Sequence, residues 1–262
     1  MQTIKHPAVA GMFYPADPQS LQQEIEQFLS DAHPALTTPP KALVVPHAGY
    51  IYSGPIAASA YASLRAARDR INRVLILAPA HRVPFQGLAF SSASQFETPL
   101  GLIPVDREAV DRIHSLPQLQ ENDFAFRDEH SIEVQLPFLQ QVLEEFSIVP
   151  LLVGDASDLQ VAEVLEQLWD GDETLILISS DLSHYLEYEA ATRMDRETTR
   201  AIEAMQPEAI SYHHACGRTP LRGLLRVARA HGLKPTTLDL RNSGDTAGSH
   251  DRVVGYGAYV FN

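Results

Sequence analysis

Short, almost wholly apolar runs alternate along the chain with segments in which apolar residues recur at helical spacing. The runs over 42–47, 74–81 and 175–181 are too short and too apolar for surface helices and predict buried parallel strands, and 148–153 predicts a further strand. We also predict a β-rich passage over 87–103 and two closing strands over 236–240 and 253–261. Helical spacing predicts helices over 17–31, 56–67, 106–116, 132–143, 157–168, 187–205, 207–214 and 219–232. The proline-rich stretch 33–40 is predicted to be a connector.

Individual polar residues, prolines and glycines mark helix ends. Ser157 and Gln160 have the spacing of a capping box, in which each side chain satisfies a backbone N–H group of the first turn. Pro137 predicts either a bend in the 132–143 helix or its true start, because proline cannot donate within a helix. Gly232 predicts the end of the last helix.

The alternation of strands and helices determines the predicted fold. It indicates an α/β protein with a mostly parallel central sheet and helices on both of its faces. The sequence contains no internal repeat, low-complexity tract or long linker, so we expect one domain over residues 1–262.

Composition narrows the possible partners. The chain has 262 residues, 45% of them hydrophobic, which is enough to bury a core without disulfides or structural metal. Its formal net charge of −13 argues against nonspecific nucleic-acid binding, which requires a basic surface. The single cysteine, Cys216, excludes an intramolecular disulfide and favours a reducing cytosol. The N-terminal residues lack a signal-peptide core and no apolar run is long enough to span a membrane, so we expect a soluble, cytoplasmic protein without membrane partners.

The three most apolar runs end in residues suited to catalysis or metal binding. His47 and His81 end two of them, and Asp181 ends the third, with His184 just after. Ligands bind open α/β sheets beyond the carboxyl ends of the strands, so these residues converge if their strands are neighbours. The sequence does not establish that adjacency, and each histidine alone is equally compatible with a turn hydrogen bond. Asp181 near His184 suits acid–base chemistry, but a helix cap beside a surface histidine explains the pair as well.

Two further groups have open interpretations. Glu129 and His130 lie at a helix entrance, where they reach a pocket or only complement the helix dipole. Cys216 precedes the last helix, whose N-terminus stabilises a thiolate, yet most free cysteines are inert and buried. Beside clustered histidines it would be a soft ligand for copper or iron. We assign no function to the remaining histidines, which lie in loops, at helix ends or on a solvated helix: His6, His33, His114, His213, His214, His231 and His250.

Common catalytic signatures are absent from the sequence. It contains no His-Glu-x-x-His or Cys-x-x-Cys metal motif, no phosphate-binding loop, no dinucleotide fingerprint and no serine-hydrolase elbow. Nucleotide-binding and serine-hydrolase functions therefore lose support.

A series of ordered motifs nonetheless resembles the Memo family, whose microbial members are often named AmmeMemoRadiSam system protein B. The resemblance runs nearly end to end and rests on the motifs at 9–15, 46–50, 52–54, 78–81, 128–133, 136–137, 179–185 and 216–218. It implies a fold similar to that of class III extradiol dioxygenases, which hold Fe(II) with two histidines and a glutamate.

Carried over to this chain, the resemblance implies a ligand set and a set of roles. His47 and His81 would bind the metal, His184 with Asp181 beside it would handle protons, and Cys216 stands where the dioxygenases have glutamate. The same motifs supply candidate substrate-binding residues: Tyr50, Glu129, His130 and Arg218. A thiolate favours copper or a redox-active iron over the triad that cleaves catechol rings.

Two functions follow as competing hypotheses. The first is a metal-dependent oxidoreductase that uses iron or copper on an unidentified small molecule. The second is a non-catalytic module that binds peptides, phosphopeptides or proteins in the same cleft, with Arg82 or Arg218 supplying positive charge. The name of the microbial group also suggests a radical S-adenosylmethionine protein as a partner.

Overall fold

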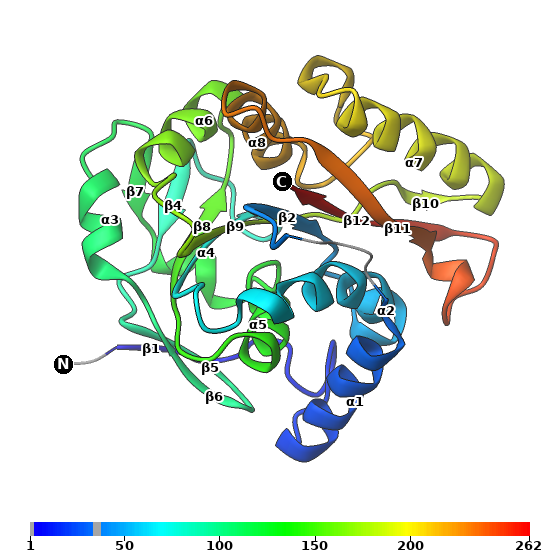
Figure 1. Cartoon of the computed structure of the whole chain (residues 1–262), viewed down its shortest axis with the longest axis horizontal. Coiled ribbons are helices and arrows are strands. Elements are labelled where there is room, and N and C mark those ends of the chain that lie inside the picture. The colour runs from blue at the N-terminus through cyan, green and yellow to red at the C-terminus, as the bar shows by residue number, and fades with distance from the viewer. Residues whose placement is uncertain (1–2, 34–37) are drawn as a thin grey trace.

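The computed structural model describes residues 3–33 and 38–262 (Figure 1). Its strands are β1 Ile4–Lys5, β2 Ala42–Val45, β3 Arg73–Pro79, β4 Leu88–Phe90, β5 Gln95–Thr98, β6 Gly101–Pro104, β7 Leu119–Glu121, β8 Ser147–Val153, β9 Thr174–Ser179, β10 His184–Leu186, β11 Pro235–Asn242 and β12 Val253–Phe261. Its α-helices are α1 Pro18–Asp31, α2 Tyr50–Tyr61, α3 Arg107–Ile113, α4 Asp123–Arg127, α5 Leu136–Val142, α6 Asp158–Gln167, α7 Tyr188–Glu203 and α8 Arg218–Ala230. Short 3-10 helices cover Ala62–Ala67, Glu133–Gln135, Pro207–Ala209 and Ser243–Asp245. The predicted 33–40 connector lies partly outside the described residues.

A nine-stranded sheet forms the centre of the molecule, in the order β10-β12-β2-β9-β3-β8-β4-β7, with β11 paired to β12. Its middle strands β2, β9, β3 and β8 are parallel, and β12 and β4 join them antiparallel on either side. The residues of the middle strands are almost all buried, which explains their continuous apolar sequences. The predicted mostly parallel sheet is therefore confirmed.

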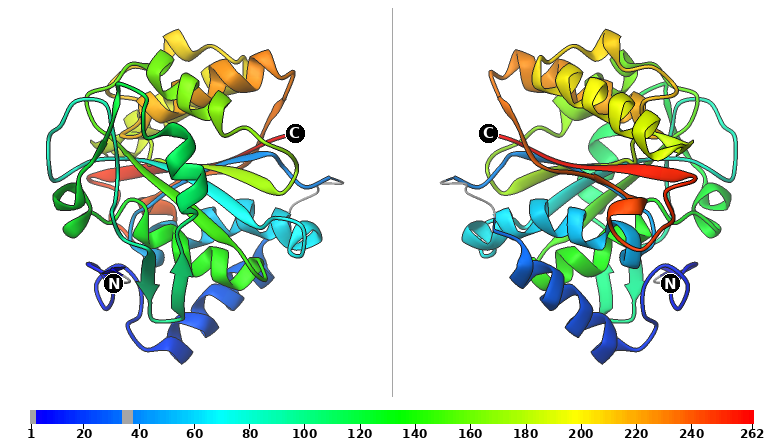
Figure 2. Two further views of the ribbon diagram at one scale, coloured as in Figure 1. Left: turned by 90° about the vertical axis from the view of Figure 1, so that its left-hand side faces the viewer. Right: turned by 90° about the vertical axis from the view of Figure 1, so that its right-hand side faces the viewer.

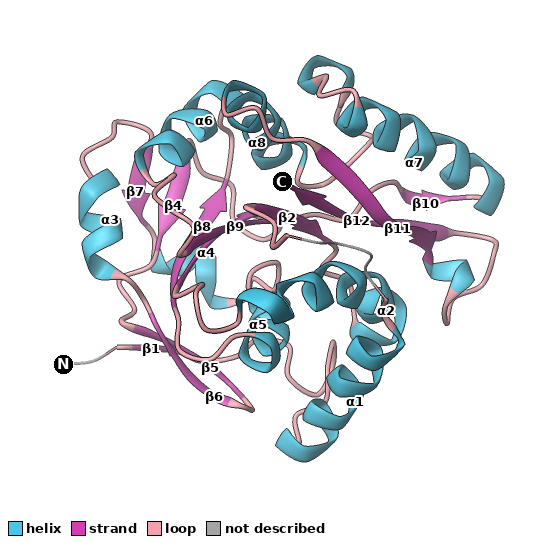
Figure 3. Cartoon of the chain, in the orientation of Figure 1, coloured by secondary structure: helices cyan, strands magenta, loops and turns pink. Residues whose placement is uncertain are grey.

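Helices cover both faces of this sheet (Figures 2 and 3). Helices α1, α2 and α5 pack together on one face, while α6, α7 and α8 cover the other. A small sheet in the order β1-β5-β6 lies to one side and ties the N-terminal segment to the rest of the chain.

Local signals fix several helix ends as predicted. Ser157 and Gln160 form both bonds of the capping box at the start of α6. Pro137 lies in the first turn of α5, so it sets the true start of that helix. Gly232 follows α8 with φ of 74°, the left-handed conformation that glycine adopts at low cost after a helix.

Some predicted boundaries were wrong. The helix predicted over 207–214 is only the 3-10 turn Pro207–Ala209, followed by non-helical turns. The helix predicted over 56–67 starts earlier, at Tyr50, and continues after Tyr61 as a 3-10 helix. Strand β10 and helix α4 were not predicted, because each is too short to show a periodic pattern.

The order of the middle strands determines which polar residues lie together at the edge of the sheet. Strand β9 lies directly between β2 and β3, and all three run parallel. His47, Asp181 and His81 each lie two residues beyond the last residue of their strand. The three strand ends therefore bring these residues to the same edge of the sheet.

Candidate metal centre

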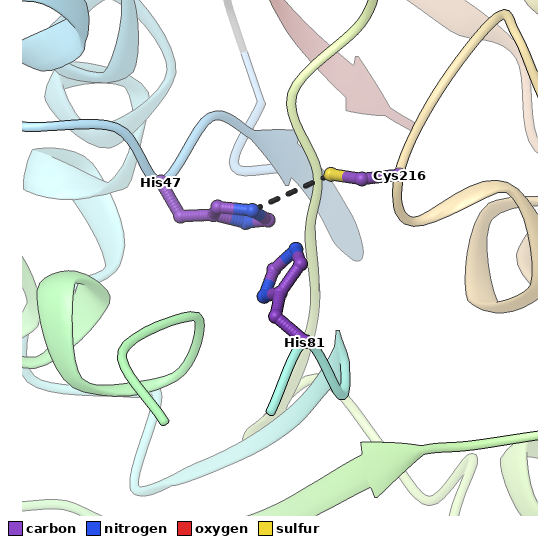
Figure 4. Close-up of side chains that lie close together, drawn as sticks. All are labelled: His47, His81 and Cys216. Atoms are coloured by element: carbon purple, nitrogen blue, oxygen red, sulfur yellow. Dashed lines mark hydrogen bonds between the residues drawn. The ribbon is translucent and has the colours of Figure 1, made fainter. Parts of the chain in front are cut away.

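Three side chains meet at this edge: His47 after β2, His81 after β3, and Cys216 just before α8 (Figure 4). Their ligand atoms all lie within 4.8 Å of one another. His47 is buried, Cys216 is partly buried and His81 is exposed. The group therefore lies at a surface opening with His47 at its floor.

The hydrogen bonds of His47 fix which of its ring nitrogens is protonated. Ser179 Oγ donates its only hydrogen to the carbonyl oxygen of Ser131 at 2.6 Å, and it accepts from Gln135 Nε2 at 2.8 Å. Its 2.8 Å contact with His47 Nδ1 must therefore be a hydrogen bond that Nδ1–H donates. The lone pair of His47 is consequently on Nε2, which faces Cys216 Sγ at 3.4 Å.

Glu129 fixes the tautomer of His81 in the same way. Its Oε1 accepts from His81 Nδ1 at 3.0 Å, and its Oε2 accepts from the His81 backbone N–H at 2.6 Å. The backbone N–H groups of His130 and Ser131 also donate to Oε1. Although burial opposes ionisation, the hydrogen bonds and the nearby His81 lower the pKa of Glu129 to about 2. An ionised Glu129 accepts the Nδ1 proton of His81 and leaves Nε2 free.

Cys216 faces the histidines as a neutral thiol. Burial, with the nearby Asp181 carboxylate, raises the pKa of the Cys216 thiol to about 12. Its Sγ lies 3.7 Å from the Asp181 carbonyl oxygen and 3.9 Å from Ser180 Oγ. The next residue, Gly217, packs so closely that an added Cβ would be 2.6 Å from the Ser180 Cβ. Glycine at this position therefore allows the segment that carries Cys216 to approach the end of β9.

His130 completes a cluster of three imidazoles. Its ring stacks on His81 at a centroid distance of 5.1 Å and meets His47 edge-on at 5.6 Å. Its buried Nδ1 has no hydrogen-bond partner, and His81, Glu129 and His130 form a second group with ligand atoms within 4.8 Å. Burial lowers the pKa of both His47 and His130, which favours neutral rings.

Asp181 and His184 do not form the predicted pair. Asp181 Oδ1 accepts the backbone N–H of His47 at 2.8 Å, while His184 Nδ1 lies 2.8 Å from the carbonyl oxygen of Leu182. The prediction that Asp181 orients His184 is wrong in this respect, because each side chain is held by backbone groups. A carbonyl only accepts, so Nδ1 of His184 is protonated and Nε2 is the basic nitrogen of this exposed ring.

The structure places the other candidate residues differently. Tyr50 is buried against Phe138, and its hydroxyl donates to the carbonyl oxygen of Val134 at 2.7 Å, so its polar atom is already paired inside the core. Arg218 stacks on the exposed ring of Tyr212, with the guanidinium carbon 4.8 Å from the ring centroid. Glu129 is buried and holds His81 and the 130–131 backbone, so it positions other groups.

Residues that support the site were missed at the sequence level. Ser179, Ser131 and Gln135 fix the His47 ring, and none of them belongs to a pattern of ligand residues. Ser131 and Ser179 lie within the motifs at 128–133 and 179–185, which was the signal available for them, and Ser179 is the last residue of β9.

The donor set fits a transition metal. A four-coordinate ion with bonds of roughly 2.0–2.3 Å holds neighbouring ligand atoms about 3.3–3.8 Å apart. The 3.4 Å between His47 Nε2 and Cys216 Sγ already meets this condition. Two neutral imidazoles with free Nε2 atoms and one thiol also match the softness that copper, iron or zinc requires.

Comparisons with known proteins cover nearly the whole chain. A family model described as "Memo-like protein" matches residues 5–260. A "MEMO1 family protein" of Aquifex aeolicus is 35% identical over 270 residues, which are 98% of this chain and 99% of the relative. Relatives with the same description from Sulfolobus acidocaldarius and Pyrobaculum arsenaticum are each 36% identical, over 97% and 99% of this chain and equal shares of their own lengths. Among the described residues, none of the helices combines the length and apolar character needed to cross a membrane.

Proposed function

The chain belongs to the Memo-like protein family, and on that premise we propose that it binds iron or copper through His47, His81 and Cys216. We propose further that it uses this metal as an oxidoreductase on a small molecule that is not yet identified. One observation carries the proposal: separate hydrogen-bond networks hold both histidines in the tautomer that directs a free Nε2 towards the group.

The choice of metal follows from the ligands. Two imidazoles and one thiolate form the set that copper electron-transfer sites use, and thiolate also suits redox-active iron. A bound metal of either kind would supply one-electron redox chemistry. Cys216 must lose its proton on metal binding, because the thiolate is the ligand. His47 needs no change of protonation, because burial lowers its pKa and favours the neutral ring.

The surroundings supply the remaining functions. His81 is exposed, so a ligand can approach the group from its side. His184 directs its Nδ1–H to the Leu182 carbonyl oxygen, so its Nε2 is the candidate atom for proton transfer. The buried Asp181 fixes the backbone of His47.

Metal stoichiometry after anaerobic reconstitution with Fe(II), Cu(I) or Zn(II) tests the proposal. We expect one equivalent of iron or copper in the wild type and loss of binding in His81→Ala and Cys216→Ser. His114→Ala, which changes an exposed histidine outside the group, should bind as the wild type does. Unchanged stoichiometry in both ligand variants would contradict the site, and a clear preference for zinc would contradict the redox assignment.

A second candidate is a recognition module for an acidic or phosphorylated peptide. The observation that favours it is the half-buried Arg218 stacked on the exposed Tyr212, only a few residues from Cys216, with Arg82 close enough to influence His130. Such a module would bind peptide equally well after metal removal, whereas a chelator that abolishes peptide binding would argue against it. A radical S-adenosylmethionine protein partner stays a prediction.

A further inference from the structure

A separate groove lies between α7, β11 and the Ser243–Asp245 turn. Its volume is about 330 Å³. Helix α7 packs over β11 and β12 in this region, at the opposite end of the sheet from β7 (Figure 1). The groove shares no residue with the metal group, and its lining is mostly polar: Tyr188, Thr192, Asp195, Arg196, Leu240, Arg241, Asn242 and Asp245.

Asp195 contributes a buried carboxyl group to this groove. Only 2% of the residue is exposed, and its Oδ1 accepts the backbone N–H of Ser183 at 3.0 Å. Within 3–33 and 38–262, no cation forms an ion pair with it, and the other group that interacts with the carboxyl is the buried Ser183 hydroxyl, which has no other partner. Gly255 packs directly against Oδ2, where any Cβ would collide with the carboxyl group. A buried carboxylate without a cation is costly unless a ligand supplies the positive charge.

Arg196 contributes the opposite charge. It is exposed, and across the described part of the chain no carboxylate pairs with it. Arg241, by contrast, is already held by Asp239 through Nε and an η nitrogen. Besides Asp245, which hydrogen bonds hold in place, the groove therefore offers one buried carboxylate without a cation and one exposed arginine without a carboxylate.

The remaining lining groups are fixed in place. Asp245 accepts the Tyr188 hydroxyl at 2.6 Å and the backbone N–H of Asn242 at 2.9 Å. The ring of Tyr188 stacks on His250 at a centroid distance of 4.5 Å. A wall that is already hydrogen-bonded loses little conformational entropy when a ligand binds.

We propose that this groove binds a small zwitterion, a dipeptide or free amino acid, with its ammonium group on Asp195 and its carboxylate on Arg196. The volume lies at the lower end of the range for small-molecule sites, which suits one or two amino-acid units. The only hydrocarbon side chain in the lining, Leu240, leaves room for one small apolar contact. The site is independent of the metal group, so it stands even where the proposed function does not.

Calorimetric titration with alanylalanine tests the proposal in the full-length protein. The pH is set at about 7.5, above the pKa of about 6 to which burial raises Asp195, so that the carboxylate is ionised. We expect saturable binding that weakens roughly tenfold or more in Asp195→Asn and in Arg196→Gln, because each removes one charge partner. Asp195→Asn keeps an oxygen for the Ser183 N–H, and Arg196→Gln changes an exposed residue, so neither should unfold the protein.

Matched controls make the result decisive. Arg193→Gln alters an arginine of the same helix that lies outside the groove, paired on the surface with Glu189; it should bind as the wild type does. Cys216→Ser should also bind normally, which separates this site from the metal group. N-acetylated and C-amidated alanylalanine should each bind at least about tenfold more weakly. No saturable binding up to about 10 mM, or equal binding in both groove variants, would overturn the proposal.

Discussion

Replacing Glu129 by glutamine tests whether a buried carboxylate controls the metal affinity of His81. The wild-type side chain accepts four N–H donors: Oε1 takes the ring of His81 and the backbones of His130 and Ser131, while Oε2 takes the His81 backbone. Glutamine keeps one accepting oxygen, which must face the three donors. Its NH₂ group then meets the His81 backbone N–H and leaves a buried donor without a partner.

The cost follows from those contacts. An unsatisfied buried donor costs about 1–3 kcal/mol, and the three remaining bonds weaken because their acceptor is no longer charged. We therefore expect the free energy of unfolding of the metal-free protein to fall by about 3 kcal/mol. A neutral amide oxygen also holds the His81 Nδ1–H more weakly than the carboxylate does, so the ring is less firmly oriented and metal affinity should fall about 10- to 100-fold. Urea denaturation measures the first quantity, and competition titration with a chelator measures the second.

Glu133→Gln is the matched control. Glu133 is equally buried in the same segment, but it accepts the backbone N–H groups of Ala8 and Val9 and the Tyr14 hydroxyl, and it pairs with Lys5 at 3.8 Å. None of these partners is a proposed metal ligand. This variant should lose a comparable amount of stability and keep wild-type metal affinity. The reasoning is refuted if Glu129→Gln binds metal within about twofold of the wild type, or if Glu133→Gln loses as much affinity.

Three further predictions concern single contacts. Ser179→Ala removes the acceptor of His47 Nδ1–H and should weaken metal binding by about tenfold in the same titration; unchanged affinity would mean that the ring is held by packing alone. Gly217→Ala places a Cβ against Ser180 and the end of β9, so we expect the free energy of unfolding, measured by denaturation, to fall by about 1–3 kcal/mol. The same Cβ should displace Cys216, which metal stoichiometry would detect as a loss of binding. Burial raises the pKa of Asp195 to about 6, so the stability from the protonated carboxyl is complete below about pH 4 and declines by about 3 kcal/mol as the pH rises through 6. Asp195→Asn should flatten that part of the stability–pH curve, and a curve identical to the wild type would contradict the assignment.

The sequence predicted the parts of the fold and site that depend on local pattern. Continuous apolar runs identified β2, β3 and β9, and the polar residues just beyond them identified His47, His81 and Asp181. Those residues were expected to converge only if their strands were neighbours, and it is the pairing of β9 with both β2 and β3 that makes them so. Strand order depends on packing between distant segments, so periodicity in one segment does not reveal it.

The sequence could not predict which groups in the site hydrogen-bond to one another. The sequence suggested that Asp181 orients His184 because the two are close in the chain, yet backbone groups hold each of them. Glu129 was expected either to complement a helix dipole or to reach a pocket. It instead accepts a hydrogen bond from His81 Nδ1, the ring nitrogen that is not offered to the metal. The 207–214 helix failed for a related reason, because Ser211 and His214 bond to each other and stabilise a turn.

Because the three ligand residues are far apart in sequence, binding of a metal by all three would report that the central sheet has folded. His47 and Cys216 are 169 positions apart, and they meet where β2 pairs with β9 and the segment next to Cys216 packs against the end of β9. A metal that binds the native group more tightly than it binds the unfolded chain would stabilise the native state. At a thousand times its dissociation constant, an ion would add about 4 kcal/mol to the free energy of unfolding. Release of the metal during denaturation should therefore coincide with loss of the central sheet rather than precede it.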